Sequence, residues 1–119
     1  MKLLLSLFLS LLISSANAGF SEALDALKTG DFKTAIFNLE KEIDKSEDDT
    51  FTPMLYAVLA NSYYQAPDDI DNDYKLAFKN YLIASKRFDA TVQYKLGVMY
   101  DTGQGVEQDF TKAIEYFEQ

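Results

Sequence analysis

The chain has 119 residues, of which 48% are hydrophobic and 25% are charged, so it can bury one modest core and is too apolar for a disordered tail. Its formal net charge of -8 repels phosphate backbones and anionic lipid heads, which excludes nucleic acid from the expected partners. Because the sequence contains no His and no Cys, zinc, haem and thiol chemistry are excluded, and so are disulfides and a lipid-modified cysteine.

The N-terminus has the features of a secretory signal peptide. Lys2 precedes an apolar run at residues 3–13, which is too short to span a bilayer comfortably. Residues 16–18 (Ala-Asn-Ala) then supply the small side chains that a signal peptidase recognises. A buried N-terminal helix is the alternative, but nothing in the run is amphipathic. We predict that residues 1–18 are a cleaved signal peptide and that the mature protein is periplasmic or secreted, without stable membrane insertion.

Three later segments share one pattern when they are aligned at an Asp: Asp, aromatic, x, x, Ala, apolar, x, x, apolar. The apolar positions recur at i, i+3, i+4 and i+7, which is one face of an α-helix. The Asp can accept hydrogen bonds from first-turn amides and complements the positive end of the helix dipole. Helices are therefore predicted to begin at the Asp residues of segments 31–39, 73–81 and 109–117.

A second periodic helix precedes two of these segments, at residues 53–64 and 90–100, and a shorter helix at residues 20–29 precedes the first segment. Acidic or glycine-containing linkers separate the helices, and no strand pattern competes. Short paired helices of this kind cannot bury an apolar face alone, so they stack on their neighbours. The predicted fold is all-α, an α/α solenoid of about three antiparallel helical hairpins. Residues 19–119 would form one repeat domain with units at about 20–45, 53–87 and 90–119.

The third unit closely resembles the Sel1-like repeat, a tetratricopeptide-like helical hairpin. The resemblance depends on residues 96–100 (Leu-Gly-Val-Met-Tyr), residues 103–106 (Gly-Gln-Gly-Val), residues 108–110 (Gln-Asp-Phe), residues 112–113 (Lys-Ala) and Tyr116. The second unit departs from the pattern, since Ala60 replaces the helix Gly and its loop lacks both glycines. The resemblance implies an interaction scaffold without an intrinsic active site. A cysteine-rich branch linked to β-lactam hydrolysis is disfavoured, because its paired cysteines are absent.

The glycines of the third unit have a physical interpretation of their own. Gly97 lacks a Cβ and would let the two helices of the hairpin approach closely, while Gly103 and Gly105 suit a tight loop with positive φ. A phosphate-binding loop is the alternative for these two glycines. It is disfavoured because no strand precedes them and no Gly-Lys-Ser/Thr follows.

Carboxylates are the remaining candidates for chemistry. Residues 68–73 place Asp at 69, 71 and 73, as in a calcium loop, but Tyr74 and Asn80 occupy the positions that need Gly and Glu. We expect a solvated helix-capping loop there and a solvated linker at residues 47–49. The chain is thus predicted to have no catalytic residue, no metal and no cofactor, and not to be an enzyme.

The expected function is that of an exported scaffold or adaptor that binds a partner protein. The alternatives are a carboxylate-dependent envelope hydrolase and an acidic inhibitor or immunity-like protein. By analogy with tetratricopeptide geometry, the first helices would line a concave face that binds the partner. The residues predicted on that face are Met54, Asn61, Tyr64, Thr91, Tyr94, Val98 and Asp101.

The end of the last hairpin is a second candidate surface. Phe110, Ile114 and Phe117 lie on one helix face, and no polar capping helix follows them in the sequence. Four explanations of this face remain open. In the first the chain self-associates there, and in the second a partner covers it. In the third the sequence is part of a longer array, and in the fourth a small protein simply tolerates an apolar edge.

Overall fold

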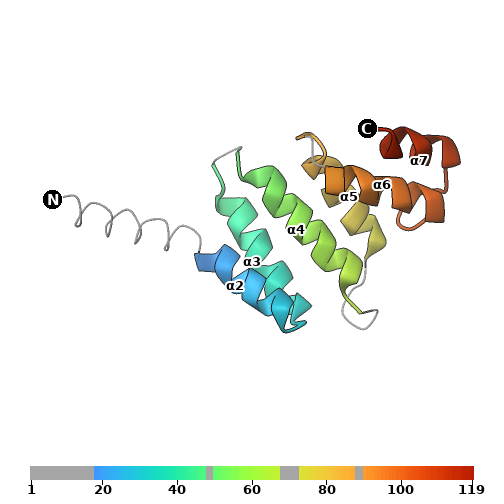
Figure 1. Ribbon diagram of the computed structural model, residues 1–119. Helices are drawn as coiled ribbons and strands as arrows, with labels where there is room; N and C mark the ends of the chain where they lie inside the picture. Colours follow the sequence, from blue (N-terminus) through green and yellow to red (C-terminus); the bar gives the residue numbers. More distant parts are fainter. Residues whose placement is uncertain (1–17, 48–49, 68–72, 88–89) are drawn as a thin grey trace.

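The structure is a computed structural model that describes residues 18–47, 50–67, 73–87 and 90–119. Within these residues it is all helical, with no strand, and the helices follow one another along one array (Figure 1). They form antiparallel hairpins of an α/α solenoid, which confirms the predicted fold class. The helices are α2 (Ala18–Lys28), α3 (Phe32–Lys45), α4 (Thr52–Gln65), α5 (Tyr74–Ala84), α6 (Ala90–Thr102) and α7 (Phe110–Phe117).

An Asp caps the second helix of each hairpin, as the shared pattern predicts. Asp31 accepts a hydrogen bond from the Thr34 amide at 3.2 Å, and Asp109 accepts one from the Lys112 amide at 3.1 Å. Asp73 accepts two, from the amides of the second and third residues after it. These bonds satisfy first-turn donors that have no partner inside the helix. Hydrogen bonds from Thr34 also lower the pKa of Asp31.

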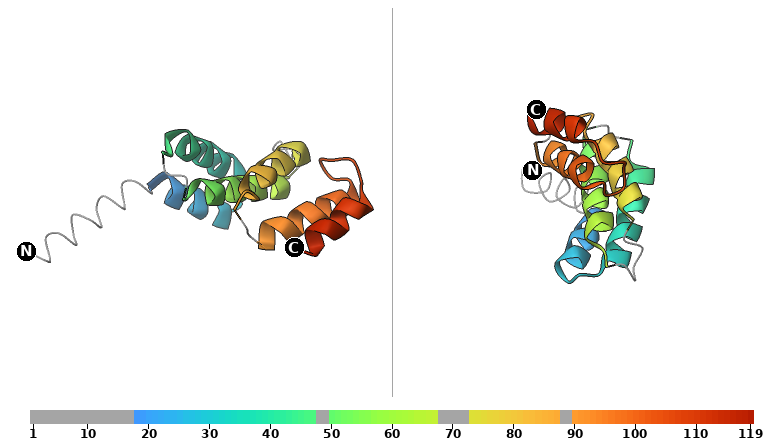
Figure 2. Two further views of the ribbon diagram at one scale, coloured as in Figure 1. Left: turned by 90° about the horizontal axis from the view of Figure 1, so that it is seen from above. Right: turned by 90° about the vertical axis from the view of Figure 1, so that its right-hand side faces the viewer.

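The core runs between consecutive helices, each of which packs on the helix before it and the helix after it. The Ala of the shared pattern is buried in all three hairpins, with exposed fractions of 0% at Ala35, 0% at Ala77 and 2% at Ala113. The last apolar position differs, because Leu39 and Tyr81 are buried and Phe117 is 47% exposed. The two further views in Figure 2 show α7 at the end of the described array.

The glycines behave as predicted. A Cβ at Gly97 would lie 2.5 Å from the Phe117 ring, so α6 and α7 approach each other where Gly97 leaves room. Gly103 and Gly105 have φ angles of 73° and 72°, and Gly30, in the turn of the first hairpin, has 77°. These angles lie in the left-handed region that favours glycine.

Several sequence predictions fall outside the described residues. They are the signal peptide up to residue 17, part of the acidic linker at 48–49, and the calcium-like segment 68–72. Helix α2 begins at Ala18, so cleavage after that residue would leave all but the first residue of the helix. None of the described helices is long and apolar enough to cross a membrane.

Candidate partner-binding surface

The predicted partner-binding residues all lie on α4 and α6, the first helices of the second and third hairpins. Met54 is 43% exposed and Tyr94 is 60% exposed. Thr91 and Asp101 are also exposed, and Val98 is partly buried. These five side chains reach the surface of the array to different degrees.

Asn61 is engaged inside its own hairpin. Its side-chain oxygen accepts a hydrogen bond from the Tyr81 hydroxyl, which comes from α5. Tyr81 is 1% exposed, and this burial is the main cause that raises the pKa of the Tyr81 hydroxyl well above its ordinary value. The electrostatic effect of Tyr64 raises that pKa further. A buried hydroxyl needs a hydrogen-bond partner. Asn61 therefore stabilises the pairing of α4 with α5 with the same oxygen that it would offer to a partner.

Tyr64 joins the second hairpin to the third. Its hydroxyl donates a hydrogen bond to Gln104 Oε1 at 2.8 Å, and the Lys95 ammonium lies 4.5 Å from the ring centroid. The Tyr74 ring meets it edge to face at 5.3 Å. Burial is the main cause that raises the pKa of Tyr64, and the electrostatic effect of Tyr74 raises it further. Gln104 is 40 positions away in sequence, so no local pattern predicts this cluster.

The glycine loop of the third hairpin rests against the start of α5. A Cβ at Gly105 would collide with the Tyr74 carbonyl oxygen and would lie 3.0 Å from the Lys75 amide nitrogen. Val106, next in the loop, packs on the core. Packing between α5 and α6 is the sparsest of the consecutive helix pairs. The loop and the Tyr64 cluster therefore supply much of the connection between the two hairpins.

Both hairpins match a known repeat. The sequence model of the Sel1 repeat matches residues 55–87 and 90–119, which cover the α4–α5 and α6–α7 hairpins. The chain belongs to the Sel1 repeat family. No curated protein and no solved structure showed a match to it. Sel1 repeats generally mediate protein–protein interaction, and their family is typically a non-catalytic scaffold.

The α2–α3 hairpin lies outside the two matched Sel1 repeats, although its second helix carries the same Asp-aromatic-x-x-Ala pattern. It packs on the first Sel1 repeat through α3 and α4. The Tyr63 hydroxyl donates a hydrogen bond to Glu40 at 2.7 Å across this junction. The hairpin thus continues the array on the N-terminal side of the Sel1 repeats.

A pocket lies where the ends of three Sel1 helices meet, near the starts of α4 and α6 and just past the end of α5. Its walls are mostly apolar and include one guanidinium group, from Arg87. Met54 is the predicted partner-binding residue among its lining residues, which are Thr50, Pro53, Met54, Ala57, Ala84, Arg87 and Val92. No carboxylate is among these described lining residues.

The end of the second Sel1 repeat carries an exposed apolar surface, as the sequence predicts. Phe110 is 60% exposed and Ile114 is 55% exposed, and Phe117 beside them keeps about half of its surface open. The Tyr94 ring lies 5.8 Å from the Phe117 ring and extends the surface onto α6. We call these four residues the terminal surface.

Acidic side chains are the remaining candidates for metal binding. Across the described part of the chain, no group of three or more His, Cys, Asp or Glu is placed to hold a metal ion. Asp73, the one described member of the calcium-like segment, uses its carboxylate to cap α5.

Proposed function

We propose that this chain is an exported scaffold or adaptor that holds a partner protein on the first helices of its Sel1 repeats and has no catalysis of its own. The observation that carries the proposal is the pair of Sel1 repeats, because repeats of this family generally mediate protein–protein interaction. Met54 and Tyr94 support the choice of face, since both are large, exposed side chains on first helices. Such side chains provide contact area for a partner.

The proposed export rests on residues 1–18, whose charge, apolar run and small residues match a signal peptide. The test is N-terminal sequencing of the protein recovered from fractionated native cells. We expect the mature chain to begin at Gly19 and to be found in the periplasm or the medium. A protein that keeps its first residues and stays in the cytoplasm would contradict export and leave the binding proposal standing.

The binding proposal is tested by capture on the immobilised chain from envelope and culture-fluid fractions, with the bound protein quantified by mass spectrometry. Met54→Ala should reduce capture by about tenfold, because the exposed Met54 would lose most of its apolar contact with the partner. Phe37→Ala is the matched control, since Phe37 is 60% exposed on a second helix, α3. Equal loss in both variants, or no loss in either, would reject the first-helix face, and circular dichroism shows whether each variant stays folded.

A further inference from the structure

The second hairpin lacks an aromatic residue that the other two hairpins have. The first helices align at the small buried residues Ala23, Ala60 and Gly97. Three positions before these residues, α2 has Phe20 and α6 has Tyr94, whereas α4 has Ala57. The Phe20 side chain packs on the core of the array, and the Tyr94 ring lies 5.8 Å from the Phe117 ring of its own hairpin. An aromatic ring at this position therefore makes packing contacts in two of the three hairpins.

The pocket beside Met54, which we call the Met54 pocket, lies where that ring is missing. Ala57 forms part of its wall, and Ala84 from the end of α5 forms another part. Because these two side chains are only methyl groups, they leave a space of about 180 Å³. A protein cavity of about 150 Å³ is large enough to hold a benzene molecule. The space beside Ala57 therefore has the size of one aromatic side chain.

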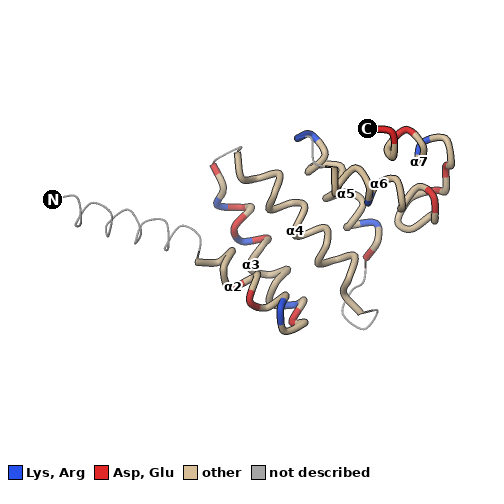
Figure 3. Tube along the Cα trace, viewed as in Figure 1, with Lys and Arg blue, Asp and Glu red and all other residues tan. Residues whose placement is uncertain are grey.

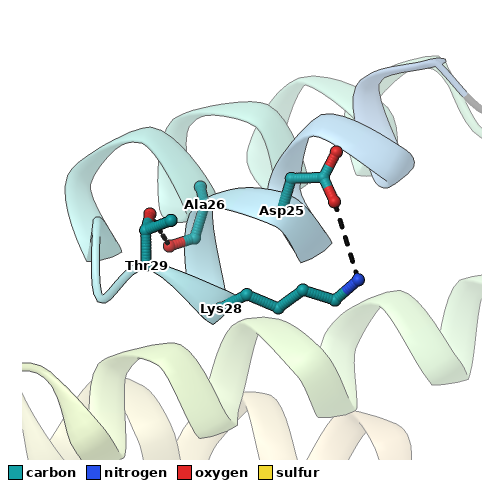
Figure 4. Close-up of polar contacts among 4 residues, drawn as sticks. All are labelled: Asp25, Ala26, Lys28 and Thr29. Carbon is teal, nitrogen blue, oxygen red and sulfur yellow. Dashed lines mark hydrogen bonds and ion pairs between the residues drawn. The ribbon is translucent and has the colours of Figure 1, made fainter.

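The one charged residue in the described wall of the Met54 pocket is basic. Arg87 forms no ion pair with a described carboxylate, and the exposed Lys86 precedes it. Figure 3 shows no charged residue along α4 and basic residues just after α5. In the first hairpin, by contrast, the Lys28 ammonium lies 3.7 Å from the Asp25 carboxylate (Figure 4). Since a guanidinium group binds carboxylates in a fixed geometry, the pocket complements an aromatic residue that has an acidic neighbour.

We propose that the Met54 pocket takes a single aromatic side chain of the partner protein, in the place that Phe20 and Tyr94 have in the other two hairpins. The ring lies against Ala57 and the neighbouring apolar wall. The Arg87 guanidinium pairs with the carboxylate of an Asp or Glu next to the aromatic residue in the partner. This inference rests on the proposed function, because it names the residue type that the first-helix face binds.

The probes are three short peptides, blocked at both ends, that differ in two adjacent residues: Phe-Asp, Leu-Asp and Phe-Lys. Binding to the purified chain is followed by NMR through the methyl signals of Ala57 and Val92. The Phe-Asp peptide should shift both signals and bind about fivefold or more tightly than the other two, since Leu-Asp lacks the ring and Phe-Lys places a second cation beside Arg87. No shift at Ala57, or equal binding of the Phe-Asp peptide and either of the others, would overturn the proposal.

Substitutions locate the site. Ala57→Phe puts the missing ring into the chain itself, so it should fill the pocket and weaken binding of the Phe-Asp peptide by about tenfold or more. Leu24→Phe is the matched control, because it adds a ring at an exposed position of α2 outside the pocket. Arg87→Gln leaves the apolar walls in place and should remove the preference for Phe-Asp over Phe-Lys. Equal weakening by Leu24→Phe and Ala57→Phe, or a preference that survives Arg87→Gln, would reject the pocket as the site.

A second copy of the chain is the rival source of the ring. Sedimentation equilibrium without peptide tests it, and self-association that Ala57→Phe abolishes would replace the partner protein with a second copy. The proposed function is tested separately, by capture with Met54→Ala. Reduced capture together with no peptide binding would reject this inference alone. Peptide binding together with unchanged capture would reject the first-helix face as the partner site, while the preference of the pocket for an aromatic residue would stand.

Discussion

The two ends of the array are built from the same hairpin pattern and have opposite surfaces. Helix α3 in the first hairpin and α7 in the last share the Asp-aromatic-x-x-Ala segment. The final apolar residue of that segment is buried at Leu39 and half exposed at Phe117. The pattern therefore determines that a helix forms and which face is apolar, while the neighbouring hairpin determines whether that face becomes core or surface.

Truncating this shared position should give the largest difference between the ends. Leu39→Ala leaves a cavity at a site with 0% exposure and should lower the free energy of unfolding by about 3 kcal/mol. Phe117→Ala removes a side chain that is already 47% exposed and should cost about 1 kcal/mol. Urea denaturation followed by circular dichroism measures both. Equal losses would show that α7 is covered in solution.

A glycine pair provides the next comparison. Gly105→Ala should lower the free energy of unfolding by about 2 kcal/mol or more. The alanine would have to keep an unfavourable positive φ, and its Cβ would collide with the Tyr74 carbonyl. Gly30→Ala has the same strained φ, but nothing lies within 4 Å of its added Cβ, so about 1 kcal/mol is expected. Hydrogen exchange should show the Gly105→Ala loss concentrated in α6 and α7. An equal effect of both variants would mean that the loop contact with α5 contributes nothing.

The features that sequence predicts well here are those set by adjacent residues. The Asp caps follow from a side chain and the amides two or three residues later, and a glycine loop depends on its own φ angles. Even the helix bounds are close, since residues 53–64 were expected for α4 and Thr52–Gln65 are observed.

The relations between hairpins could not be predicted in the same way. Tyr64 is on the expected helix and was predicted to bind a partner, yet its ring and hydroxyl already contact Tyr74, Lys95 and Gln104. The contact of Gly105 with Tyr74 likewise depends on how two hairpins pack. Periodicity gives the face of a helix and not the residues opposite it. Partner binding at Tyr64 therefore stays a prediction.

Asp31 and Asp109 cap helices at opposite ends of the array, and removing the two caps should have different consequences. Asp109→Ala should cost about 1 kcal/mol and unwind the start of α7, which has only 8 residues and carries the terminal surface. Asp31→Ala should fray the start of α3, which has 14 residues and keeps its later turns. NMR chemical shifts of the two helices measure the fraying. Fraying that is more extensive in α7 of Asp109→Ala than in α3 of Asp31→Ala is the expected result, and the reverse would contradict it.

The Asp31 cap also predicts a pH dependence. Its folded-state pKa is lowered from the ordinary value of 3.8 by hydrogen bonds from Thr34, so the folded state favours the charged carboxylate. The cap therefore contributes its full stability above pH 3.8 and loses it as the pH falls through the lower folded value. An NMR titration of the Asp31 carboxyl carbon measures the shift. A folded pKa at or above the ordinary value would show that the hydrogen bond is not formed.

The smallest expected effect is at the polar end. Asp25→Asn breaks the ion pair with Lys28, but both side chains are more than two thirds exposed, at 73% and 78%. An exposed pair of this kind contributes about 0.3 kcal/mol, so the free energy of unfolding should hardly change.

The charges at this end matter because they keep α2 hydrated where α4 and α6 bury apolar residues. The informative variant is therefore Glu22→Leu with Asp25→Leu, which should leave the fold intact and make the chain associate with increasing concentration in sedimentation equilibrium, α2 of one copy meeting α7 of the next. Ile114→Glu in the same background should abolish that association, whereas association that survives it would place the contact elsewhere and remove the terminal surface from the explanation.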